Sequence, residues 1–148
     1  MPNHMKNCSF NLQSSGRTIC EGVELELKGN LQQMDSRFSV NFRFGSGIAY
    51  HFGLRLHEKG HHEVFQGFKD IEWEELDTEV WPKDSEEIKK GLTFRLCGEE
   101  IVVYVDGAQQ CKAFEIKVPF EKITGIELWD DIKWVEEVNL RFNTNGVK

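Results

Sequence analysis

An imidazole and a guanidinium stand on either side of a glycine in one short run of the chain. His51, Gly53 and Arg55 alternate there with Phe52 and Leu54. Side chains on a β-strand point to opposite faces in turn, so the first three share one face and the two apolar residues share the other. His51 and Arg55 offer hydrogen-bond donors, and Gly53 leaves a shallow gap between them. The pattern indicates either a polar ligand-binding floor or an ordinary solvated sheet face.

The preceding segment adds polar groups to the same face if it pairs with this run. Ser39, Asn41 and Arg43 alternate with apolar residues throughout 38–44. The Gly-Ser-Gly sequence at 45–47 is a natural connection between two such strands. We therefore predict a hairpin that gathers polar donors on one wet face and buries its other face.

A second group of residues has the types of a metal site but not the spacing. His57, His61 and His62 lie close together in the sequence, near Glu58 and Glu63. Histidines and carboxylates bind transition metals, but such sites use fixed spacings that hold the ligands together. We expect a solvated loop here, and no metal ion or cofactor.

Paired acidic residues raise the alternative of a glycoside hydrolase, which uses two carboxylates across the bond that it cleaves. Such pairs occur at 74–75, 130–131 and 136–137. Neighbours on a strand face opposite ways, so none of these pairs meets across one substrate. The sequence also lacks a G-x-S-x-G motif, a phosphate-binding loop and zinc-ligand spacing. The expectation is a protein that is not an enzyme.

The elements that must position these residues are short strands. Turn residues such as Asp106-Gly107 and Pro119 separate runs of alternating or clustered apolar residues. Strands are predicted at 23–27, 38–44, 48–57, 63–66, 71–80, 92–97, 101–105, 112–118, 125–129 and 133–142. At most one helical turn is expected, near residues 120–123. So many short strands with frequent turns predict an all-β sandwich or barrel.

Length and charge limit the class of protein. The 148 residues fit a single domain, and acidic residues outnumber basic ones by 25 to 18, for a formal net charge of −7. The basic surface typical of nucleic-acid binding is missing, so neither nucleic acid nor membrane insertion is expected.

The cellular compartment is predicted from what the sequence lacks. No long apolar run resembles a signal peptide or a membrane span, which predicts a cytoplasmic protein whose export would need a route without a signal peptide. Cys8, Cys20, Cys97 and Cys111 show no C-x-x-C spacing, so free thiols are expected.

Residues 38–55, with the sequence FSVNFRFGSGIAYHFGLR, resemble the paired central strands of the galectin family of β-galactoside-binding lectins. The second of those strands carries H-x-N-x-R in the family, and His51-Phe-Gly-Leu-Arg55 matches two of the three positions. Segments at 22–29, 91–96, 103–107 and 123–134 resemble further strands in the same order, so that roughly residues 16–142 are covered. The resemblance implies a two-sheet antiparallel, jelly-roll-like β-sandwich with little or no helix, and a sugar on its concave sheet.

The resemblance also implies a carbohydrate site made by His51, Arg55, Gln66, Trp73 and Glu75. His51 and Arg55 would donate hydrogen bonds to sugar hydroxyls, and Trp73 would stack on the apolar side of galactose. Gln66 matches a second asparagine of the family. Glu75 matches the carboxylate that follows the tryptophan if one residue is deleted relative to the family.

Departures from the family pattern decide how far its function is carried over. Gly53 stands where the family has asparagine. Without the deletion, Leu76 and Thr78 take the positions of the family's glutamate and arginine; with it, Glu75 and Asp77 do. The second arginine is missing either way.

These changes bear on the partner. They predict a protein that binds galactose-containing glycans or glycoproteins with altered preference, or with very weak affinity for plain lactose. The alternative is a galectin-fold protein without sugar binding, which acts through protein contacts or self-association. Relatives associate through sheet edges or terminal strands, and a homodimer stays open here.

Overall fold

The fold is almost entirely β-structure in a computed structural model that describes residues 6–11, 19–32, 36–56, 62–81, 87–88, 90–109 and 112–142. One 3-10 helix, η2 (Phe120–Lys122), is present among these residues. The strands are β1 (Lys6–Asn11), β2 (Glu24–Gly29), β3 (Leu31–Gln32), β4 (Ser36–Phe44), β5 (Gly47–Leu56), β6 (His62–Lys69), β7 (Trp73–Trp81), β8 (Glu87–Ile88), β9 (Gly91–Cys97), β10 (Glu100–Val105), β11 (Ala108–Gln109), β12 (Phe114–Glu115), β13 (Gly125–Asp130) and β14 (Val135–Arg141).

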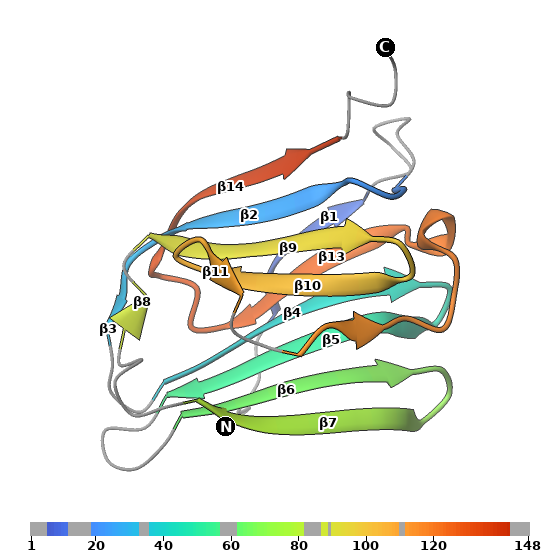
Figure 1. The fold of residues 1–148 in the computed structure, drawn as a ribbon, viewed down its shortest axis with the longest axis horizontal. Helices are drawn as coiled ribbons and strands as arrows, with labels where there is room; N and C mark the ends of the chain where they lie inside the picture. Colours follow the sequence, from blue (N-terminus) through green and yellow to red (C-terminus); the bar gives the residue numbers. More distant parts are fainter. Residues whose placement is uncertain are drawn as a thin grey trace.

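Two antiparallel sheets form the sandwich that the sequence predicted (Figure 1). Each sheet has six strands, and we call the one with the longer strands the larger sheet. The larger sheet has the strand order β1-β13-β4-β5-β6-β7, so that β7 is an edge strand. The smaller sheet has the order β11-β10-β9-β2-β14, and β12 also pairs with β10. Strands β3 and β8 form a separate short pair.

The core lies between the two sheets, and it is built from the apolar side of each alternating strand. Phe94 of β9 reaches across the sandwich to Phe52 of β5, with 5.0 Å between ring centroids, and to Phe42 of β4, at 6.2 Å. Leu25 and Leu27 of β2 are also buried. Burial of these side chains fixes which face of the larger sheet is turned inward. We call this the core face, and the opposite side of the larger sheet the open face.

The predicted Asp-Gly turn and the central hairpin are confirmed. Strands β4 and β5 pair antiparallel, and Phe44 lies opposite Gly47. At the predicted Asp-Gly turn, Asp106 has φ of 52° and Gly107 has φ of 92°, as the tightest hairpins require. The single predicted helical turn is η2, which follows Pro119.

The structure corrects the predicted strand at 112–118, of which only β12 is a strand. Its two ends are bound to different sheets. The backbone N–H of Lys112 donates to Glu79 on β7 at 2.8 Å, whereas the N–H of Ile116 donates to the carbonyl of Glu99 in the smaller sheet at 2.9 Å. A segment that crosses between sheets cannot continue one ladder.

The expected solvated histidine loop is wrong for His62. This residue begins β6 and is buried. His57 and His61 lie outside the described residues. Cys20 and Cys97 are free thiols. In the ranges that the structure describes, no helix is long and apolar enough to cross a membrane.

We expect the substitution Phe94→Ala to lower the free energy of unfolding by about 3–5 kcal/mol, because it leaves a cavity where rings from both sheets meet. Denaturant titration measures the change. Ile71→Ala is the matched control, because Ile71 is 86 % exposed, and it should change the free energy by less than about 0.5 kcal/mol. A loss below about 1 kcal/mol for Phe94→Ala would contradict this account of the core.

Candidate functional site

An imidazole and an indole meet on the open face. The rings of His51 on β5 and Trp73 on β7 lie edge to face, with centroids 5.2 Å apart and an interplanar angle of 67°. The indole is 44 % exposed, although tryptophan is usually well covered in a folded domain. The ammonium of Lys69 lies 5.6 Å from the centroid of the same indole. An aromatic surface is therefore held in place and left open to a ligand.

A hydrogen bond from Asn41 on β4 fixes the orientation of His51, and Trp129 on β13 in turn contacts Asn41. In the amide orientation that suits its neighbours, Asn41 donates from Nδ2 to His51 Nδ1 at 2.7 Å, and its Oδ1 accepts from Trp129 Nε1 at 3.3 Å. A neutral imidazole that accepts at Nδ1 carries its proton on Nε2. This Nε2 lies 3.0 Å from the position that a Cβ on Gly53 would take. His51 thus presents a donor over the glycine gap.

Arg55 and Phe65 border the glycine gap. Gly53 lies opposite Phe65 in the β5–β6 register, and Phe65 Cβ lies 3.5 Å from the position of a Cβ on Gly53. The Arg55 guanidinium lies 5.2 Å from the centroid of the Phe65 ring, and its side chain is exposed. The Arg55 guanidinium therefore packs on an aromatic ring. The sequence predicted Arg55 as a donor but did not predict Phe65 beside it.

Leu76 completes the side of the site along β7. It pairs with Gly67 of β6, and its Cδ1 lies 2.9 Å from the position that a Cβ on Gly67 would take. Trp73 Cζ3 lies 3.2 Å from that same position, so the leucine and the indole are neighbours above the glycine. Leu76 is 50 % exposed.

These side chains surround a hollow of about 350 Å³ on the open face. That volume is within the range of small-molecule sites. It is lined by Arg37, Phe38, Ser39, His51, Gly53, Leu54, Arg55, Phe65, Trp73, Leu76 and Asp130.

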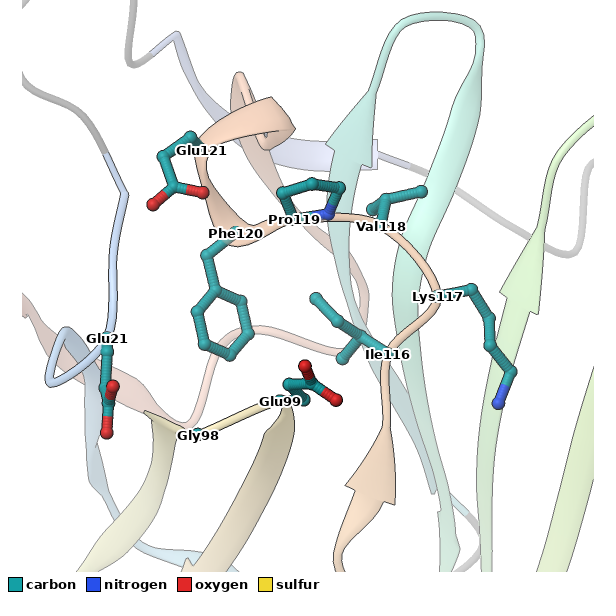
Figure 2. A pocket seen from close by; sticks show the side chains of 9 residues that line it. All are labelled: Glu21, Gly98, Glu99, Ile116, Lys117, Val118, Pro119, Phe120 and Glu121. Atoms are coloured by element: carbon teal, nitrogen blue, oxygen red, sulfur yellow. The ribbon is translucent and has the colours of Figure 1, made fainter.

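A larger hollow, of about 470 Å³, lies elsewhere and contains none of the residues that sequence reasoning singled out (Figure 2). Ile116 and Phe120 form part of its wall, together with the carboxylate-bearing residues Glu21, Glu99 and Glu121. In Figure 2 the Lys117 side chain points away from this hollow. The smaller hollow is the candidate site, because it holds both an exposed indole and oriented donors.

Gln66 is not part of this group, which corrects the assignment made from the sequence. It is only 3 % exposed and lies opposite Phe52, whose side chain is in the core. Its Oε1 accepts from the hydroxyl of Tyr50, and its Nε2 donates to the carbonyl of Lys112 at 2.8 Å. The Gln66 amide thus lies on the core face, and both its oxygen and its nitrogen form hydrogen bonds within the fold.

Glu75 is also turned to the side opposite His51, which corrects the second assignment. It lies opposite the buried Phe68 in the β6–β7 ladder, and its Oε1 forms an ion pair with Lys117 Nζ at 3.2 Å. The hydrogen bond from Lys117 to Glu75 raises the pKa of Lys117 above its usual value. Of the two alternatives that the sequence left open, the structure supports Leu76 with Thr78 on the open face.

The structure therefore brings together His51, Arg55 and Trp73 and leaves Gln66 and Glu75 outside. Sequence reasoning missed Phe65, although its signal was present, since it alternates with Val64 and Gln66. Within the described ranges no cluster of three histidine, cysteine or acidic side chains could hold a metal ion. The site can offer stacking and hydrogen-bond donors to a small polar ligand.

Comparisons with known proteins agree with this fold. The family model described as Galactoside-binding lectin matches residues 9–140. No curated protein sequence matches the chain. Solved structures do: galectin LEC-6 of Caenorhabditis elegans is 23 % identical with a TM-score of 0.69, covering 95 % of this chain and 96 % of its own.

Two further structures are similar in fold. A variant of human galectin-16 is 17 % identical with a TM-score of 0.71, covering 92 % of this chain and 95 % of its own. A toad ovary galectin in complex with N-acetylgalactose is 16 % identical with a TM-score of 0.67, covering 91 % and 98 %.

The substitution Gln66→Ala should lower the free energy of unfolding by about 1–3 kcal/mol, because it leaves the buried hydroxyl of Tyr50 and the carbonyl of Lys112 without their bonds. Denaturant titration measures this. Tyr50→Phe combined with Gln66→Ala should cost less than the sum of the two single changes. Full additivity, or a loss under about 0.5 kcal/mol, would contradict the core-face position of this amide.

The substitution Glu75→Gln should lower the pKa of Lys117 toward its usual value near 10.5, since the hydrogen bond to a charged carboxylate is lost. NMR titration of the lysine side chain measures the shift. Because the folded pKa is raised, the pair stabilises the fold below the ordinary lysine range, and this contribution disappears as pH rises through the folded pKa. Asp77→Asn on the same strand is the control, and an equal shift there would contradict the assigned pair.

Proposed function

This chain belongs to the galactoside-binding lectin family, and from that premise we propose that its open face binds galactose-containing glycans with the sugar ring lying on Trp73. The observation that carries the proposal is the exposed indole, held edge to face with His51 at 5.2 Å. The apolar side of a galactose ring stacks on such a surface, and its hydroxyls need donors at the ring edge. His51 Nε2 and Arg55 supply those donors.

We further propose that plain lactose binds weakly. Gly53 has no side-chain amide. On the open face of β7, Leu76 and Thr78 stand where the family has charged side chains. Each absent hydrogen bond to a sugar hydroxyl costs about 1–2 kcal/mol. Two or three such losses weaken binding by about 10²–10⁴-fold relative to a complete site.

The proposed activity is binding without catalysis. The described residues around the hollow combine donors, an indole and apolar side chains with the single carboxylate-bearing residue Asp130. Hydrolysis of a glycosidic bond uses two carboxyl groups on either side of that bond. Stacking and hydrogen bonding are what this arrangement supports.

A second candidate is a galectin-fold protein that acts through protein contacts. Its support is the edge strand β7, on which Leu76 is 50 % exposed and Val80 is 59 % exposed. Exposed apolar side chains on an unpaired edge are typical of surfaces that meet another protein. Saturable galactoside binding that depends on Trp73 favours the lectin.

The substitution Trp73→Ala should reduce galactoside affinity at least about 10-fold, because the stacking surface is removed. Isothermal titration with lactose and longer galactosides measures this, and Val80→Ala on the same strand is the matched control with unchanged affinity. If both variants bind as the unmodified protein does, the sugar does not lie on Trp73. If a broad glycan panel stays silent, the second candidate takes its place.

A further inference from the structure

One wall of the hollow is built from apolar side chains. Trp73 and Leu76 of β7 lie side by side above Gly67, and Phe65 lies two residues before that glycine on β6. Because residues two apart on a strand share a face, Phe65 continues the wall that the other two begin. All three side chains line the same hollow.

The other wall is polar. His51 and Arg55 on β5 and Ser39 on β4 line it, and Asn41 holds the imidazole in place from behind. Gly53, which would otherwise carry a side chain toward the ligand, leaves the floor between the walls low. A ligand lying on the floor therefore contacts hydrogen-bond donors along one edge and apolar side chains along the other.

The apolar wall changes which ring substituents are tolerated. A sugar hydroxyl pressed against the Leu76 side chain loses its water and finds no hydrogen bond there in return, which weakens binding about 5-fold or more. A methyl group in the same place is removed from water, which strengthens binding about 4-fold. The two effects act in the same direction.

We propose that this site selects galactosides that carry a methyl-bearing substituent, an N-acetyl or O-methyl group, on the ring edge turned to Phe65 and Leu76. The inference rests on the function proposed above, since it names the ligand class of the same hollow. Phe65 and Leu76 are then the residues that determine specificity, whereas Trp73 provides the platform that any galactoside uses.

The test compares matched ligands on the whole chain. Isothermal titration is run with galactose and lactose, with galactosides O-methylated at one hydroxyl at a time, and with N-acetylgalactosamine. At least one substituted ligand should bind about 5-fold or more tightly than its plain counterpart. The O-methyl series and the N-acetyl sugar separate the two sources of the methyl group, and the position that gains affinity identifies the edge that meets the wall.

Two glutamate substitutions on β7 provide the matched pair of variants. Leu76→Glu places a carboxylate in the wall, and Val80→Glu places one on the same face about 13 Å further along the strand. Leu76→Glu should abolish the preference for the substituted ligand and improve binding of the plain one. Val80→Glu should leave the preference unchanged. Both side chains are at least half exposed, so thermal melting should show both variants folded.

The outcomes separate this inference from the proposed function. If every plain galactoside binds as tightly as its substituted partners, and binding still depends on Trp73, the methyl preference is wrong while the lectin function stands. A preference that survives Leu76→Glu also overturns the inference. If no ligand binds and Trp73→Ala changes nothing, the proposed function itself fails.

Discussion

The register in which β5, β6 and β7 pair decides which side chains meet on the open face. Gly53 lies opposite Phe65, and Phe65 lies opposite Thr78. Because side chains alternate strictly, a slip of one residue would turn Phe65 inward and bring the amide of Gln66 out. The contacts that prevent this slip are on the core face. Gln66 binds Tyr50 and Lys112 there, so the polar bonds that hold the fold also make one wall of the ligand site apolar.

The same alternation separates structural charge from the binding face. On β7, Glu75 and Glu79 both bind the segment 112–117. Glu75 forms an ion pair with the ammonium of Lys117, and Glu79 accepts a hydrogen bond from the backbone N–H of Lys112. The open face of that strand carries the uncharged side chains of Trp73, Leu76, Thr78 and Val80. The carboxylate expected beside the sugar is therefore present in the sequence but engaged on the other side of the sheet.

Alternation within one hairpin was enough to predict the common face of His51, Gly53 and Arg55, because nearest neighbours along a strand need no knowledge of the rest of the fold. The positions of Gln66 and Glu75 could not be predicted by matching motifs. A count of residues between motifs does not record a bulge, and the β6–β7 ladder shifts register between Phe68 and Lys69. On β7 the extra residue of that shift is Glu74, which lies between Trp73 and Glu75.

Two further parts of the fold could not be predicted from the sequence, because they depend on pairing with distant strands. The strand β1 carries the polar run KNCSFN, which has no clear apolar alternation, and it is a strand because it pairs with β13 at the edge of the sheet. The segment 112–118 reads as a strand, yet its ends are bonded to two different sheets. Tertiary pairing decided both cases.

Side-chain NMR during a galactoside titration tests the central claim most directly. If register sorts the side chains as described, the indole N–H of Trp73 and the imidazole of His51 shift with ligand, while the side-chain amide of Gln66 stays where it is. A shift of the Gln66 amide with an unmoved Trp73 indole would contradict this arrangement of the two faces.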